Sequence, residues 1–244
     1  MGTPSPRDVP FDREVPAGYT ARMLELRAIT RAYELGGERA GVFGVSLEVP
    51  QGCLAVIAGP SGSGKTTLLQ VAGLLDPPDE GEVWLEGEPV SRRPERARCD
   101  LRLRRLGFVF QAFNLVPVLS ALENVMLPLQ LQGLPPAAAR TRAEAILERV
   151  GLADRSDRRP GQLSGGQQQR VAIARALAPE PALVLADEPT ANLDHAHGVP
   201  LMELMSELAR ERGTAFLVAS HDPAVIAQAH RVFRLVDGRL AVAP

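Results

Sequence analysis

The sequence is poor in lysine and cysteine and has no long hydrophobic run. Of its 27 lysine and arginine residues, Lys65 is the only lysine. The two cysteines, Cys53 and Cys99, lack the spacing of a metal site or a redox pair, so we expect free thiols in a reducing compartment. No apolar stretch approaches the roughly 20 residues that span a bilayer. The sequence therefore predicts a soluble protein that reaches a membrane only through a partner.

The charge balance gives no sign of a polyanionic partner. The formal net charge is −2, so bulk electrostatics favour neither nucleic acid nor an anionic membrane surface. Residues 1–22 combine prolines with charged residues and have no apolar core, which predicts a disordered N-terminal extension and not a signal peptide. We expect a cytoplasmic chain without a nucleic-acid partner.

Residues 23–244 predict a single α/β domain. The apolar run 54–58 is typical of a buried parallel strand, and the runs 182–186 and 214–219 resemble it. Segments 24–29 and 42–49 predict antiparallel strands around a turn at 36–37. Further strands are expected at 82–86 and 107–110, and at 232–236 and 239–242, which flank the hairpin signal Asp237-Gly238.

Helices are expected at 66–75, 135–150 and 167–178. The segment from about 112 to 166, rich in leucine, alanine, arginine and glutamate over much of its length, predicts a helical subdomain. The expected architecture is α/β: a mainly parallel sheet flanked by helices, with an antiparallel β subdomain and an inserted α-helical subdomain.

Residues 59–66 fit the phosphate-loop pattern G-x-x-x-x-G-K-[ST] at every fixed position. The glycines let backbone N–H groups converge on phosphate oxygens, and the following helix points its positive end at them. Lys65, a compact ammonium, would reach the β- and γ-phosphates, and the Thr66 hydroxyl would bind Mg²⁺. The alternative, a chance glycine-rich turn, is disfavoured by the strand before and the helix after.

Asp187 and Glu188 follow a predicted buried strand. Asp187 is suited to hold the water shell of Mg²⁺, and Glu188 to act as general base on the attacking water. Such a pair alone would indicate only a solvated loop, but the phosphate loop upstream favours the catalytic interpretation.

Ser164, Gly165, Gly166 and Gln167 stand at the start of a predicted helix. Ser164 is a natural N-cap, and the glycines leave helix-start N–H groups open to an anion. The motif indicates either a second phosphate-binding surface or an ordinary capped helix.

Together these motifs resemble the ATP-binding-cassette (ABC) family of ATPases, over about residues 23–243. The resemblance implies a P-loop NTPase core that uses Mg²⁺ to hydrolyse ATP to ADP and phosphate. It places Tyr33 against adenine, Gln111 at the metal and the water, and His221 at the γ-phosphate, and it makes 191–194 a loop that crosses between partners. The implied nucleotide contacts are Tyr33, Gly59, Pro60, Ser61, Gly62, Ser63, Gly64, Lys65, Thr66, Thr67, Ser164, Gly165, Gly166, Gln167 and Asp194; the metal contacts are Thr66, Gln111 and Asp187; the catalytic residues are Glu188, His221 and Gln111.

Taken singly, the weaker matches have ordinary explanations. Tyr33 alone would indicate packing, Gln111 a polar loop residue, and His221 a capping or surface histidine. The remaining histidines, His195, His197 and His230, are expected at the surface.

The family's geometry explains why one chain would carry two phosphate-binding surfaces. In the family two cassettes face each other head to tail, and each ATP lies between the phosphate loop of one and the Ser-Gly-Gly helix start of the other. The resemblance therefore implies a homodimer that closes on ATP. Ser164 and Gly166 would act on the ATP of the other copy. Six residues would act on the ATP of their own copy: Lys65, Thr66, Gln111, Asp187, Glu188 and His221.

Residues 108–117 and 121–125 resemble the branch that contains the lipoprotein-release (LolD) and macrolide-export (MacB) ATPases, with the cell-division ATPase FtsE close by. This implies an integral membrane permease, docked at the helical subdomain near 113–115, and a location on the inner face of the membrane. The same segment could instead pack inside the subdomain. The substrate is not indicated.

Two other functions are alternatives to export. An FtsE-like regulatory ATPase would carry the same motifs without transport. A soluble ABC protein of DNA repair or translation would carry tandem cassettes or coiled-coil insertions, which are missing here. Two departures from the family, Pro200 near the first turn of the helix after 191–194 and His195, concern the shape of that segment.

Overall fold

The computed structural model describes residues 21–35, 38–191, 193 and 195–241, which form two sheets flanked by helices. The predicted extension 1–22 lies almost wholly outside the described residues, and the first strand begins at its end, at Arg22.

The larger sheet has six strands in the order β10-β9-β3-β8-β7-β6. Neighbouring strands from β9 to β6 are parallel, and β10 pairs antiparallel with β9 across Asp237 and Gly238. All residues of β3 are buried, as expected for a parallel strand covered on both faces. The predicted parallel sheet and C-terminal hairpin are confirmed. Its strands are β3 Leu54–Ala58, β6 Leu106–Val109, β7 Leu183–Asp187, β8 Ala215–Ser220, β9 Arg231–Val236 and β10 Arg239–Leu240.

The smaller sheet is antiparallel, with strand order β2-β1-β4-β5. Its first two strands are longer than the sequence predicted, and the turn 36–37 between them lies outside the described residues. The strands are β1 Arg22–Leu35, β2 Glu38–Pro50, β4 Glu80–Leu85 and β5 Glu88–Pro89.

The helices are α1 Lys65–Ala72, α2 Glu95–Arg105, α3 Ala121–Leu131, α4 Pro136–Arg149, α5 Gly165–Leu177, α6 His195–Arg212 and α7 Pro223–Ala227, with short 3₁₀ turns η1 Ala153–Arg155 and η2 Pro160–Gln162. The prediction that α1 reaches residue 75 is wrong. The helix ends at Ala72 because Gly73 caps it and Leu74 takes a left-handed φ of 59°. Pro200 lies inside α6 as its sixth residue, past the expected first turn.

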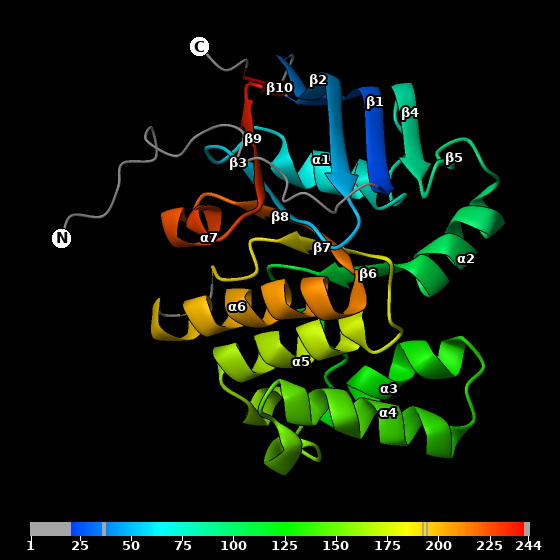
Figure 1. Cartoon of the computed structure of the whole chain (residues 1–244), viewed down its shortest axis with the longest axis vertical. Coiled ribbons are helices and arrows are strands. Elements are labelled where there is room, and N and C mark those ends of the chain that lie inside the picture. The colour runs from blue at the N-terminus through cyan, green and yellow to red at the C-terminus, as the bar shows by residue number, and fades with distance from the viewer. Residues whose placement is uncertain (1–20, 36–37, 192, 194, 242–244) are drawn as a thin grey trace.

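The elements stack in layers, and α1 lies between the two sheets (Figure 1). Alternation along β3 assigns its side chains to two separate cores. Ala55 and Ile57 belong to the core shared with α1 and the antiparallel sheet. Leu54 and Val56 belong to the core shared with α3, α4, α5 and α6. The carboxyl ends of the parallel strands, where the candidate site residues lie, are thus fixed by packing on both faces.

The segment 112–166 holds α3 and α4, the helices farthest from the antiparallel sheet in Figure 1. Ser120 opens α3 with a capping box, in which its hydroxyl accepts from the Glu123 N–H and its own N–H donates to the Glu123 carboxylate. The buried Asn124 side chain bonds to the backbone of Val116, Leu119 and Ser120, so the loop before α3 is tied to the helix. The limits of a helical subdomain remain a prediction.

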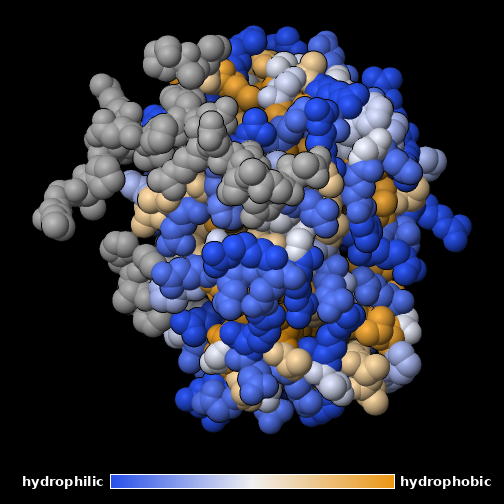
Figure 2. All heavy atoms as spheres, viewed as in Figure 1, coloured by the Kyte–Doolittle hydropathy of each residue, from blue (hydrophilic) through white to orange (hydrophobic). Residues whose placement is uncertain are grey.

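Hydrophilic residues cover most of the face in Figure 2, and hydrophobic ones appear between them in small groups. The most exposed large apolar side chains in the described part of the chain are Val118 (71% exposed), before α3, and Leu131 (65%), at its end. No helix among the described residues has both the length and the apolar character needed to cross a bilayer.

His230 is half-buried, so its predicted place at the surface is wrong. The ring Nδ1 of His230 accepts a hydrogen bond from the backbone N–H of Leu54 at 3.0 Å. The backbone N–H of His230 donates to the Leu54 carbonyl at 2.8 Å. An Nδ1 that accepts an N–H carries no proton. Burial, together with the charge of Arg210, lowers the pKa of His230 below its usual 6.5.

We expect acid to destabilise the fold through His230. Its pKa is lower in the folded than in the unfolded chain, so between these values the unfolded chain binds more protons. The contribution of neutral His230 to the free energy of unfolding is fully present above about pH 6.5, and it is lost as the pH falls toward the pKa of His230 in the folded chain. His230→Asn keeps an acceptor for Leu54 but does not titrate. Urea unfolding at pH 7.5 and 5.5 should show a smaller acid loss in this variant, and an equal loss would contradict the assignment.

Candidate active site

The predicted phosphate loop connects β3 to α1. Gly62 and Gly64 have φ of 79° and 99°, which favours glycine at both. At Gly59 the reason for glycine is a neighbour, because a Cβ there would lie 2.2 Å from the Leu235 carbonyl oxygen on β9. The Gly238 N–H also donates to the Ser63 carbonyl at 3.1 Å. The C-terminal hairpin therefore holds the loop in shape.

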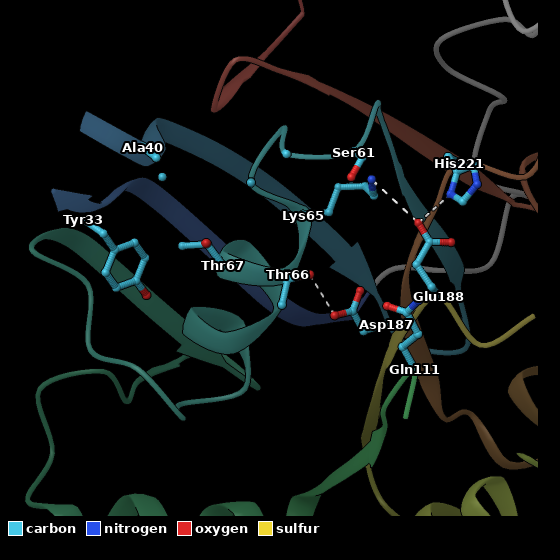
Figure 3. Close-up of a pocket in the computed structure, with 13 residues that line it drawn as sticks. Tyr33, Ala40, Ser61, Lys65, Thr66, Thr67, Gln111, Asp187, Glu188 and His221 are labelled. Carbon is cyan, nitrogen blue, oxygen red and sulfur yellow. Dashed lines mark hydrogen bonds and ion pairs between the residues drawn. The ribbon is translucent and has the colours of Figure 1, made fainter. Parts of the chain in front are cut away.

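Lys65 is 7% exposed and lies along this loop (Figure 3). Its Nζ donates to the carbonyls of Gly59 and Pro60 at 2.9 and 3.0 Å, and lies 3.7 Å from Glu188 Oε1. The ammonium thus lies between the loop and a carboxylate at the end of β7. An anion bound in the loop would contact the ammonium there.

Thr66 and Asp187 face each other across the base of the site. The Thr66 hydroxyl donates to Asp187 Oδ2 at 2.8 Å. Burial raises the pKa of Asp187, with the Thr66 hydrogen bond acting against it and the charge of Glu188 adding to it. A cation here would offset the cost of burying the charged Asp187 carboxylate. A hydroxyl beside a carboxylate suits Mg²⁺, which takes few protein oxygens as ligands and fills its other positions with water and phosphate oxygens. The described residues contain no cluster of three or more histidine, cysteine or acidic residues that would favour another metal.

Glu188 follows β7 in a strained backbone conformation, with φ of 45°. Its N–H donates to the Ala219 carbonyl at 2.9 Å, which pins it to β8. Its Oε1 lies 2.8 Å from His221 Nδ1, and its Oε2 accepts from the Ser220 hydroxyl at 3.3 Å. Two residues at the end of β8 therefore orient this carboxylate, which is 12% exposed.

Tyr33 on β1 lies at the far side of the site from Glu188 (Figure 3). Its hydroxyl donates to Asp76, and burial together with that carboxylate raises the pKa of Tyr33. The Arg31 guanidinium lies 4.9 Å from the ring centroid and pairs with Asp76. Arg31 covers one face of the ring, so a planar ligand would stack on the other.

One cavity of about 430 Å³ joins these groups. Two of its lining residues, Ala40 and Gly41 on β2, match no motif in the sequence. A Cβ on Gly41 would lie 2.0 Å from the Arg31 carbonyl oxygen, so only glycine fits there. The small Ala-Gly pair inside a strand was the available signal. The cavity is lined by Tyr33, Ala40, Gly41, Ser61, Gly62, Gly64, Lys65, Thr66, Thr67, Gln111, Asp187, Glu188 and His221.

The Ser164 motif opens on a different cavity, of about 300 Å³, formed with Gly151, Leu152, Gly166, Gln167, Arg170 and Leu193. Ser164 caps α5, as predicted: its hydroxyl oxygen accepts the Gln167 N–H, and its own N–H donates to Gln167 Oε1. The hydroxyl proton stays available to a ligand. The two cavities share no lining residue. Asp194 lies outside the described residues.

Comparison with known proteins gives consistent matches. A family model described as "ABC transporter" matches residues 42–191. The chain is 48% identical over 220 residues to an uncharacterized ABC transporter ATP-binding protein of Thermotoga maritima, covering 90% of this chain and 94% of that protein. It is 49% identical over 222 residues to the lipoprotein-releasing system ATP-binding protein LolD of Pseudomonas syringae pv. tomato, covering 91% and 98%.

Solved structures give the same match. A bacterial ABC transporter cassette, MJ0796, was solved as a dimer; it has a TM-score of 0.85 and 40% identity to this chain, covering 90% of this chain and 97% of that one. The same cassette was also solved as a dimer in a post-hydrolysis state with ADP and phosphate.

Proposed function

The chain belongs to the ABC transporter family and is an ATP-hydrolysing subunit, and from this premise we propose which residues carry the reaction and what it drives. The observation that supports the assignment is the convergence of Lys65, Thr66, Asp187, Glu188 and His221 on one cavity. They come from the phosphate loop and from the ends of the neighbouring strands β7 and β8.

Glu188 is the general base of the proposed reaction. It takes a proton from water, whose oxygen forms a bond to the γ-phosphorus as the bond to the bridging oxygen breaks, releasing ADP and phosphate. His221 and Ser220 hold the carboxylate in place, and His221 contacts the γ-phosphate. Lys65 and the loop N–H groups balance the charge on the phosphates.

Thr66 and Asp187 would hold Mg²⁺, with Gln111 beside them in the same cavity. When bound there, the ion would supply positive charge that offsets the negative charge of the phosphates. Tyr33 would stack on adenine at the far side of the cavity.

Two copies of the chain would complete each site. Within one chain the Ser164 cavity is separate from the Lys65 cavity, so Ser164, Gly165, Gly166 and Gln167 would serve the ATP of the other copy. The related cassette solved as a dimer supports this arrangement.

The subunit would drive a separately encoded membrane permease and lie on the inner face of the membrane through it. We propose that the docking surface lies on the segment around α3. There Val118 and Leu131 are exposed, and Phe113 to Leu115 form a loop. Leu115 packs partly against the core, so this loop can pack inside the subdomain and also contact the permease. The likeness to LolD supports lipoprotein release or a related export as the driven step.

Docking is tested by co-purification in detergent. A tagged chain is expected to retain a membrane protein, and Val118→Asp with Leu131→Asp is expected to lose it without loss of the isolated chain's ATPase activity. Val236→Asp, at an exposed valine of β9, is the matched control and should keep the partner. If the wild type hydrolyses ATP but retains no membrane protein, the permease assignment is wrong. A retained partner that transfers no substrate would favour the regulatory, FtsE-like role.

A further inference from the structure

Arg175, near the end of α5, bonds to the loop that follows Gln111. Its Nη1 donates to the Asn114 carbonyl at 2.5 Å, and its Nη2 donates to the Phe113 carbonyl at 2.9 Å. The two donors of one planar guanidinium thus hold two consecutive peptide carbonyls. A lysine would have to make both bonds from one ammonium nitrogen, without two donors fixed in a plane.

The bound loop has an unfavourable backbone conformation. Phe113 and Asn114 both have left-handed φ, of 59° and 50°, although neither is glycine. Such residues persist only where their surroundings hold them, and they concentrate at functional sites. The Arg175 bonds fall on the carbonyls of these two residues, so the guanidinium is placed to hold the strained turn.

The side chain of Arg175 also has unusual surroundings. Burial lowers the pKa of its guanidinium from the ordinary value. In the described part of the chain no carboxylate lies within 4.0 Å of it, whereas the arginines of α2 and α4 commonly pair with an acidic residue. Burying a cation without a counter-charge is costly unless its hydrogen bonds are satisfied. The two loop carbonyls accept the hydrogen bonds that the buried guanidinium needs.

The position of Arg175 connects the two halves of the site. Gln111 lines the cavity of Lys65, and Ser164, which opens α5, lines the other cavity. Arg175 lies eleven positions after Ser164, the N-cap of α5, which corresponds to a rise of about 16.5 Å at 1.5 Å per residue. Strand β6, which leads to Gln111, also meets α5 closely: a Cβ on Gly107 would lie 2.6 Å from the Ala176 carbonyl oxygen.

We propose that Arg175 is a positioning residue that fixes Gln111 in the ATP site and ties it to the helix that presents Ser164 to the second copy. This inference rests on the proposed function, because it gives Gln111 a task in hydrolysis.

A double-mutant cycle tests the inference. Arg175→Lys is expected to lower kcat for Mg²⁺-ATP by about tenfold and to leave KM within about twofold, because the phosphate loop is untouched. Gln111→Ala is expected to lower kcat further. If Arg175 acts through Gln111, the double variant should be no slower than Gln111→Ala. A purely structural role would instead give multiplied losses.

Two further variants guard against loss of folding. Asn114→Pro, in an exposed turn, fixes φ near −65° and pulls the loop from its held conformation, so it should reproduce the kcat loss and the same non-additivity with Gln111→Ala. Arg149→Lys, at an ion pair between α4 and α6, is the matched control and should hydrolyse ATP like the wild type. Thermal unfolding checks each variant.

The outcomes separate the two claims. Normal kcat in Arg175→Lys and Asn114→Pro, or multiplied losses in the cycle, would overturn the role of Arg175 while hydrolysis itself stands. A wild-type chain without Mg²⁺-dependent hydrolysis would overturn the proposed function and the inference with it.

Discussion

Glu188→Gln is expected to bind ATP normally and to hydrolyse it about 10²–10⁴-fold more slowly, the usual weight of a general base. The amide keeps the shape of the carboxylate and can still bond to His221 and Ser220, the partners it has in the structure. It cannot accept the proton of the attacking water. Hydrolysis should therefore fall while the phosphate loop and Lys65 retain the nucleotide.

The measurement is single-turnover hydrolysis beside equilibrium ATP binding. Glu144→Gln, at a solvent-exposed ion pair on α4, is the control and should leave both unchanged. Near-normal turnover in Glu188→Gln would reject Glu188 as the base. If His221→Ala were then the slower variant, His221 would take that role.

Two inactive variants are expected to restore activity when mixed. Lys65→Ala removes the ammonium from the phosphate loop. Ser164→Asp keeps the α5 cap, because aspartate is a good N-cap, but places a negative charge against phosphate. Each homodimer has two defective sites, whereas a mixed dimer has one site with both defects and one with none. Random pairing should therefore give about one quarter of wild-type activity.

The assay is the ATPase rate of the mixture against each variant alone, with two different tags to verify mixed dimers by sequential pull-down. Lys65→Ala carrying one tag mixed with Lys65→Ala carrying the other is the control and should stay inactive. Verified mixed dimers without recovered activity would show that Ser164 does not serve the other copy's ATP.

Much of the fold followed from local patterns. The apolar run at β3 by itself predicts a buried strand, and the turn residues Asp237-Gly238 by themselves predict a hairpin. Neither prediction needs information from distant parts of the chain. Helix α2 was not predicted, because it has no apolar face: none of its residues is buried. It is stabilised instead by pairs such as Arg98 with Glu95 and Arg104 with Asp100, which hydrophobic periodicity does not report.

The sequence predicted which residue types form the site, but not the contacts that hold those residues in place. Motif spacing indicated Lys65 and Glu188, yet the closeness of Leu235 to Gly59 depends on a strand more than 170 residues later. The bond between His230 and Leu54 joins residues 176 positions apart, and the bond from Arg175 to Asn114 joins residues 61 positions apart. Such contacts arise only when distant segments meet, so no local pattern encodes them. The roles of the site residues remain predictions for the experiments above.

The left-handed backbone of Glu188 has a consequence for protein engineering. Glycine adopts that conformation without the strain that a side chain imposes, so on backbone grounds alone Glu188→Gly is favoured over glutamate by about 1 kcal/mol. A screen that rewards heat resistance alone would therefore weigh this backbone strain against the contacts of the carboxylate with Lys65, His221 and Ser220, and not against its role in the reaction. Selection for stability in this chain needs a simultaneous selection for turnover, since at position 188 the backbone conformation favours glycine and the reaction needs the carboxylate.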